Sequence, residues 1–159
     1  MSFRSATIGF LAVVVIMMVT SFGVQQDCPK IDRKTLKNYM VTAGYTVKDL
    51  NTTEGQEKYE VVLKKDGLDI PIAMEITPST NYIWMTVKLG PAPADGDLQH
   101  SKMLKQNGII QPCQFYITSS GNLMVGLPIE NKSVTIASLI RSMDIIGGRV
   151  SESKSIWMH

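Results

Sequence analysis

Histidine limits the acid–base chemistry of this chain, because the only two histidines are His100 and His159. A serine or cysteine nucleophile needs a base such as histidine within hydrogen-bond reach. We expect His159, the last residue, to be frayed, and His100 to lie on the polar face of a helix. The chain also contains no Gly-x-Ser-x-Gly motif. The sequence therefore argues against a hydrolase with such a nucleophile.

Two aspartates near His100 indicate a different chemistry. Asp95 and Asp97 flank Gly96, and hard cations bind clustered carboxylates. A small metal-dependent or other enzyme that uses Asp95, Asp97 and His100 is therefore the alternative function. The residues from Leu98 onward do not supply the oxygen ligands of an EF-hand loop. We favour the interpretation that Asp95 or Asp97 caps a helix, and we predict no metal and no cofactor.

The two cysteines of the chain, Cys28 and Cys113, leave two alternatives open. In an oxidising compartment an even pair is a candidate disulfide. The other interpretation is a buried thiol in a strand at Cys113 and a loose thiol in a tail at Cys28. The chain has no Cys-x-x-Cys motif, and two cysteines so far apart do not form a zinc-ligand pattern.

The N-terminal segment has the three parts of a secretory signal. Arg4 precedes an uncharged run, Ala6–Val24, and small residues indicate cleavage after Gly23. We therefore predict a signal peptide at 1–23, a leader at 24–30, and export to the periplasm or the extracellular space. The alternative is an uncleaved membrane anchor, since a spanning helix needs about 20 apolar residues. We expect contact with a membrane only in that case.

The composition of the chain bounds its size and its partners. A chain of 159 residues, 44% hydrophobic and 19% charged, suffices for one compact domain with a buried core. The net charge of +2 argues against a nucleic-acid-binding protein that acts by charge alone. We therefore expect a single folded domain at 31–158 and no nucleic-acid partner.

Hydrophobic periodicity predicts the helices and strands of this domain. Apolar residues at helical spacing predict a first helix that Gly44 ends, and Asp66-Gly67 marks a hairpin between two alternating runs. We expect Leu98, Met103 and Leu104 to face inward from the middle helix. The last helix begins near Ser133, and we expect Gly147-Gly148 to stop it. The predicted helices are 31–43, 97–107 and 133–146, and the predicted strands are 58–63, 68–77, 82–89, 112–118 and 122–127.

The predicted fold class is α+β: a five-stranded antiparallel sheet with helices packed on it, in the order α-β-β-β-α-β-β-α. This order and its aromatic residues resemble the type III secretion chaperones (the Tir chaperone class) and the related YbjN-like domains. The residues that carry the resemblance are Tyr82-Ile83-Trp84-Met85, Gln114-Phe115-Tyr116-Ile117 leading over Gly121-Asn122-Leu123 to Val125-Gly126-Leu127-Pro128, and the final helix after Asn131-Lys132-Ser133-Val134-Thr135.

The resemblance covers about Ile31–Trp157 and implies protein–protein binding. It implies a small dimer whose sheet or helices hold an extended segment of a partner protein, without catalysis. The secretion chaperones are cytosolic and usually acidic, whereas this chain has a predicted export signal and a nearly balanced charge. We therefore expect a partner in the cell envelope.

The leading prediction is an exported, non-enzymatic domain that binds another protein or itself, so a homodimer is included. An exposed sheet edge or an apolar helix face would accept the partner segment. Aromatic residues dominate binding hot spots, and the candidate contacts are Tyr82, Trp84, Ile140 and Met143. The alternative for the two aromatic residues is that a helix covers them and they belong to the core.

Overall fold

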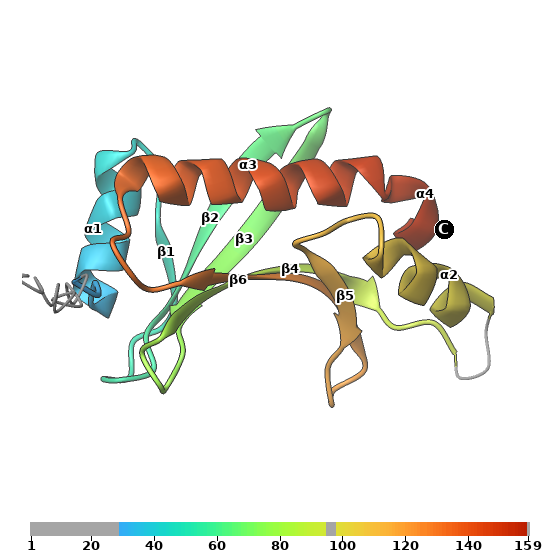
Figure 1. Cartoon of the computed structure of the whole chain (residues 1–159), viewed down its shortest axis with the longest axis horizontal. Helices are drawn as coiled ribbons and strands as arrows, with labels where there is room; N and C mark the ends of the chain where they lie inside the picture. Colours follow the sequence, from blue (N-terminus) through green and yellow to red (C-terminus); the bar gives the residue numbers. More distant parts are fainter. Residues whose placement is uncertain (1–28, 95–97, 159) are drawn as a thin grey trace, which may run out of the picture.

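The computed structural model describes residues 29–94 and 98–158. The strands are β1 (Lys48–Asn51), β2 (Lys58–Lys65), β3 (Leu68–Ile76), β4 (Tyr82–Pro91), β5 (Gln114–Ile117) and β6 (Asn122–Glu130), and the helices are α1 (Arg33–Thr42), α2 (Leu98–Asn107), α3 (Ile136–Glu152) and α4 (Lys154–Trp157). The strands form one antiparallel sheet in the order β1-β2-β3-β4-β6-β5. The long helix α3 crosses one face of this sheet, with α1 and α2 at opposite ends (Figure 1).

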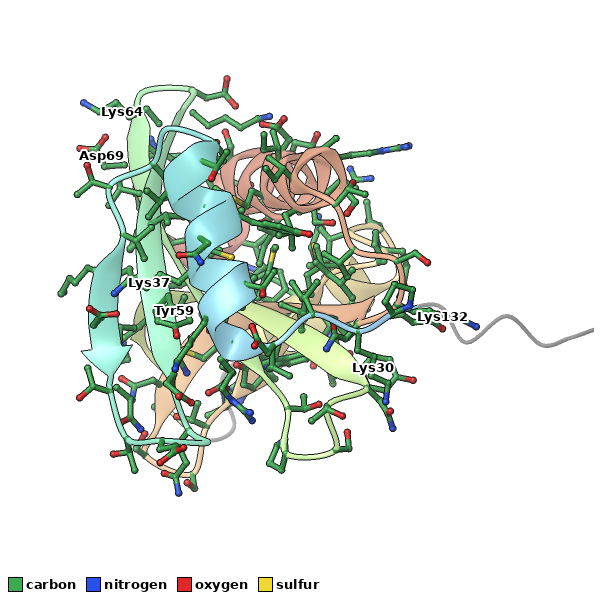
Figure 2. All side chains as sticks on the ribbon, turned by 90° about the vertical axis from the view of Figure 1, so that its left-hand side faces the viewer. Lys30, Lys37, Tyr59, Lys64, Asp69 and Lys132 are labelled. Atoms are coloured by element: carbon green, nitrogen blue, oxygen red, sulfur yellow. The ribbon has the colours of Figure 1, made fainter. Side chains whose placement is uncertain are left out.

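The predicted α+β class is confirmed, but the predicted number of five strands is wrong because the sheet has six. The missed strand is β1, whose side chains are mostly exposed, so no apolar alternation marks it in the sequence. Its position comes from pairing with β2 and from α1. Lys37 of α1 donates to Asp49 of β1 at 2.7 Å, and the Lys37 ammonium lies 5.7 Å from the centre of the Tyr59 ring (Figure 2).

The core lies between α3 and the sheet. Ile72 of β3 and Met85 of β4 are fully buried there, together with Leu139, Met143 and Ile146 of α3. The helix packs on β2, β3, β4 and β6. Since side chains alternate along a strand, every second residue of these strands points into this core and the others point away from α3.

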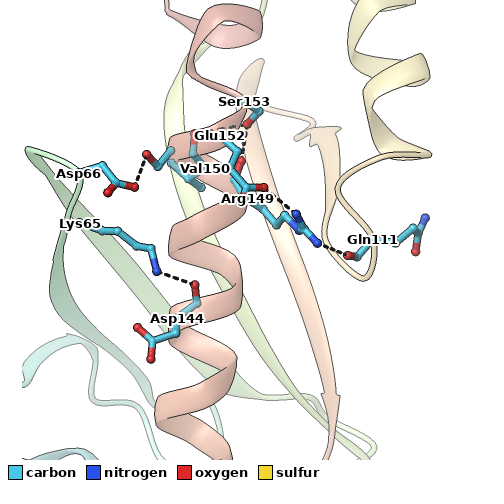
Figure 3. A network of polar contacts seen from close by, with 9 residues as sticks. Lys65, Asp66, Gln111, Asp144, Arg149, Val150, Glu152 and Ser153 are labelled. Atoms are coloured by element: carbon cyan, nitrogen blue, oxygen red, sulfur yellow. Dashed lines mark hydrogen bonds and ion pairs between the residues drawn. The ribbon is translucent and has the colours of Figure 1, made fainter.

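The last helix does not stop at Gly147-Gly148 as predicted, because α3 continues through both glycines to Glu152. A Cβ atom added at Gly147 would lie 2.5 Å from Leu63 Cδ2, so the absence of a side chain lets α3 approach β2 closely. Polar contacts accompany this approach (Figure 3). Lys65 donates to the Asp144 carbonyl at 3.4 Å. The Ser151 hydroxyl of α3 donates to the Asp66 carboxylate, at the turn between β2 and β3, at 2.7 Å.

The middle helix α2 does not bury the three residues that we predicted. Leu98 is 78% exposed and Leu104 is 72% exposed, whereas Met103 is buried. The reason is that α2 packs mainly on β5 and α4, at the end of the sheet. Gln99, which is buried, donates to the Ile156 carbonyl of α4. Because α2 has few neighbours at this position, the apolar side chains of Leu98 and Leu104 remain exposed on the surface.

A buried asparagine joins the start of the domain to the end of β6. Asn131 has 0% exposure. Its side-chain amide donates to the Ile31 carbonyl at 2.9 Å and the Thr80 carbonyl at 3.0 Å, and it accepts from the Ile31 N–H at 3.1 Å. Pro29, near the end of the predicted leader, accepts from the Ser133 N–H at 3.1 Å. The chain is therefore attached to the domain from residue 29 onward.

The predicted signal peptide at 1–23 and most of the predicted leader lie outside the described residues. The signal, its cleavage and the alternative of an anchor therefore stay predictions. None of the helices in the described part of the chain combines the length and the apolar character needed to cross a membrane.

Alanine substitutions at the two α3 glycines should have opposite effects. Gly147→Ala should lower the free energy of unfolding by about 1–3 kcal/mol, because the new methyl group meets Leu63. Gly148→Ala is the matched control: its nearest neighbour is the Lys65 side chain at 3.6 Å, and we expect a gain of about 0.5–1 kcal/mol from helix propensity. Urea unfolding measures both. Equal destabilisation by the two changes would contradict the close approach of α3 to β2.

Candidate functional site

Tyr82 and Trp84 lie on the sheet face that points away from α3. In β4 they alternate with Ile83 and Met85, which are fully buried. Tyr82 is 44% exposed, and Trp84 is half-buried. The alternative in which a helix covers the two aromatic residues does not hold for the described helices, since α1, α2 and α3 lie on the other side (Figure 1).

Trp84 forms an aromatic pair with Tyr116 above a glycine in β6. The ring centres are 6.0 Å apart, and the ring planes are inclined by 50°. A Cβ atom at Gly126 would lie 2.7 Å from the Trp84 ring and 3.0 Å from the Tyr116 ring, so both rings rest on the glycine backbone. Burial raises the pKa of the Tyr116 hydroxyl. Sequence reasoning missed this pair, although a glycine inside an apolar strand signals such a close approach.

The two α3 residues of the predicted surface lie on the opposite side of the sheet from Trp84. Met143 has 0% exposure and belongs to the core, and Ile140 is half-buried. A partner would touch Met143 only after the core had opened. Tyr82, Trp84, Ile140 and Met143 therefore do not form one surface.

The exposed apolar side chain of Leu104 on α2 borders a pocket next to β5. This α2–β5 pocket has a volume of about 270 Å³ and an almost wholly apolar lining. Met103, Phe115 and Leu123 are the buried part of the lining, and Leu104 and Ile117 are its exposed part, at 72% and 46%. Exposed apolar side chains gathered around a pocket are typical of a binding site. Sequence reasoning missed it, because it assigned Leu104 to the core.

The outer edge of β5 is closed beside this pocket. The Phe115 N–H donates to Asn107 Oδ1 at 2.6 Å, and Asn107 Nδ2 donates to the Phe115 carbonyl at 3.2 Å. The Cys113 N–H donates to the Ile110 carbonyl at 2.9 Å. An added strand would need the backbone groups of Phe115. A ligand at the α2–β5 pocket is therefore held by side-chain contacts.

His100 lines the α2–β5 pocket, so the imidazole predicted for a metal site faces apolar side chains. Its Nε2 atom is buried and has no hydrogen-bond partner within the described residues. Asp95 and Asp97 lie outside those residues. In 29–94 and 98–158, no three histidine, cysteine or acidic side chains gather at a distance that suits a metal ion.

Cys113 is fully buried just before β5. Burial raises the pKa of its thiol to about 11, so the reactive thiolate is scarce at neutral pH. Cys28 lies outside the described residues. The disulfide between Cys28 and Cys113 therefore stays a prediction.

Nine chains of solved structures match this chain. One belongs to the heterodimeric complex ExoU–SpcU from the type III secretion system of Pseudomonas aeruginosa, with 15% identity, a TM-score of 0.54, and coverage of 76% of this chain and 96% of that one. Another belongs to the HopA1–SchA chaperone–effector complex, with 13% identity, a TM-score of 0.53, and coverage of 75% and 90%. The chain has a type III secretion chaperone-like fold.

The resemblance predicted from the sequence is thus confirmed at the level of the fold. No protein-family model and no curated protein matches the chain. At such low identities a shared fold does not transfer an activity.

The Cys113 thiol should be unreactive in the folded protein. In a Cys28→Ser variant, we expect no reaction with a thiol reagent such as Ellman's reagent at pH 8, and one equivalent of reaction after unfolding in guanidinium. The physical reason is that a thiol with a raised pKa stays protonated at pH 8 and is shielded from the reagent. Fast reaction in the native state would show that the β5 region opens readily.

Proposed function

We propose that this chain is a non-enzymatic, chaperone-like domain that binds a segment of another protein at the α2–β5 pocket. The observation that carries the proposal is the exposure of Leu104 and Ile117 beside an apolar pocket. Removing a large aliphatic side chain from water is worth about 1.5–3 kcal/mol when burial is complete. Two such side chains and a pocket supply enough driving force to select an apolar partner segment.

The fold supports this proposal. The structures that share the fold include a heterodimeric complex and a chaperone–effector complex. Proteins in both therefore use this architecture in assemblies with another protein. For this chain the partner is a protein segment with apolar side chains, and a second copy of the chain is the other occupant that the test must separate.

The mode of binding follows from the closed edge of β5. Because Asn107 already occupies the backbone groups of Phe115, the segment is not added to the sheet as a seventh strand at this position. Apolar side chains of the segment enter the pocket and cover Leu104 and Ile117. The sequence led us to expect a sheet edge or an apolar helix face that holds the segment through backbone pairing and side-chain pockets, and the proposal keeps only the side-chain contacts.

A polar or charged side chain placed at the pocket rim should abolish partner binding. We expect Leu104→Glu and Ile117→Thr to remove a protein that co-purifies with the wild-type chain from cells that express it naturally. Val41→Glu is the matched control, because Val41 is 54% exposed on α1 at the other end of the sheet. All three variants should keep the wild-type melting temperature, since each changes an exposed side chain.

The same variants separate the two occupants. Sedimentation of the purified wild-type chain reports whether it forms a dimer, and a dimer that Leu104→Glu dissociates would assign the surface to a second copy. Equal capture of a partner by wild type, Leu104→Glu and Ile117→Thr would contradict the proposed binding site.

We further propose that the chain is exported and acts in the cell envelope or outside the cell. The support is the predicted signal at 1–23, with its uncharged run and small residues before the expected cleavage position. Intact-mass measurement of the chain from its native source should give a protein that begins at Val24 and is found outside the cytoplasm. A chain that retains Met1 and fractionates with the membrane would favour the anchor instead.

A further inference from the structure

The large apolar side chains that the described residues expose gather at one end of the sheet. Five of the nine lie on α2, β5 and α4 or shortly after them: Leu98, Leu104, Ile109, Ile117 and Met158. These three elements are neighbours, because α2 packs on β5 and on α4 (Figure 1). We call the surface of α2, β5 and α4 the α2 end of the domain. Exposed apolar area gathered in this way is typical of a binding surface.

The charged side chains of these three elements all have the same sign. The helices α2 and α4 contribute Lys102, Lys105 and Lys154, and α2, β5 and α4 contain no aspartate or glutamate. The sequence has no acidic residue at any position from 98 to 129, although the whole chain has 16 basic and 14 acidic residues. The α2 end therefore combines exposed apolar side chains with positive charge.

No acidic side chain within residues 29–94 and 98–158 forms an ion pair with Lys102 or Lys105. Six other cations form ion pairs there, such as Lys37 with Asp49 at 2.7 Å. Lys102 and Lys105 are both exposed and lie three residues apart on α2, so their charges are neighbours on the helix surface. Lys105 stabilises the C-terminal end of the helix as a cation in the last turn, but Lys102 lies outside that turn.

The exposed face of α2 brings these lysines next to the leucines. Leu98, Lys102 and Lys105 follow one another at spacings of four and three residues, which places them side by side on a helix. Leu104, which precedes Lys105, borders the α2–β5 pocket. A partner segment that covers Leu104 therefore comes within reach of the lysine ammonium groups.

We propose that the partner segment carries acidic side chains beside its apolar ones, with the apolar side chains at the α2–β5 pocket and the carboxylates opposite Lys102 and Lys105. The inference rests on the proposed function, because it names the chemistry of the segment that is bound there. Complementary charges across an interface speed the encounter, and like charges reject the wrong partner. The apolar contacts thus provide the affinity, and the two lysines select an acidic segment over a basic one.

The test uses three synthetic peptides and the full chain. The peptides share the same leucines at helical spacing and differ only at the polar positions, which are glutamate, glutamine or lysine. We expect fluorescence anisotropy to show the glutamate peptide binding about three- to tenfold more tightly than the glutamine peptide, as two exposed ion pairs provide, and the lysine peptide binding most weakly. The preference should vanish at about 1 M salt, where the Debye length is only about 3 Å.

The double variant Lys102→Gln/Lys105→Gln should bind the glutamate and glutamine peptides equally. The matched control is Lys34→Gln/Lys132→Gln, which changes the net charge by the same amount at two exposed lysines, of which Lys132 lies at the α1 end (Figure 2). The control should keep the preference for glutamate. If the Lys102→Gln/Lys105→Gln variant fails to fold, as judged by its melting curve, the salt dependence of the wild-type preference still decides.

Equal binding of the three peptides by the wild-type chain would overturn the inference, as would the same loss of preference in both double variants. Two other occupants are then distinguished. Cosedimentation with phosphatidylglycerol vesicles that Lys102→Gln/Lys105→Gln abolishes would assign the α2 end to a membrane surface. A dimer of the purified chain that the same variant dissociates would assign it to a second copy.

The outcome is separable from that of the proposed function. Loss of native partner capture in Leu104→Glu, with equal binding of the three peptides, would keep the binding surface and discard the acidic character of the segment. A preference for glutamate that depends on Lys102 and Lys105, with capture that ignores Leu104→Glu, would keep a surface for acidic segments and discard the pocket as the capture site.

Discussion

The structure depends on the close packing of one long helix against one face of the sheet. Gly147 brings α3 into contact with Leu63 of β2, and the apolar stripe of α3 reaches across β2, β3, β4 and β6. Because the described helices lie on this one side, β2, β3, β4 and β6 each have one face packed under α3 and one face turned away from it. The helix α3 continues past both glycines, because the packing of neighbouring residues such as Ile146 and Val150 stabilises it more than the low helix propensity of glycine destabilises it.

This arrangement explains where the apolar surfaces are. Next to β5 the helical layer is formed by α2, which packs mainly on β5 and α4. A helix with so few neighbours buries little more than Gln99 and Met103, so Leu104 remains exposed. Binding surfaces in such folds arise where an amphipathic element has more apolar area than its own domain covers. The α2–β5 pocket is that place in this chain.

The polar groups around the pocket have structural roles. Asn107 closes the backbone of Phe115, which protects the edge strand from pairing with other chains. Cys113 is a buried thiol with a raised pKa, which makes it a poor nucleophile. His100 Nε2 is buried without a hydrogen-bond partner among the described residues.

Local periodicity in the sequence determined the α+β class, the core strands, the stripe of α3 and the shared face of Tyr82 and Trp84, because alternation and helical spacing record which side of an element is buried. Only the tertiary structure decided what covers each face. The exposed strand β1, the passage of α3 through Gly147, the exposed Leu104 and the Trp84–Tyr116 pair over Gly126 all depend on neighbours distant in sequence. Spacing along the chain does not contain that information, since the same apolar residue suits a core or a surface that binds a partner.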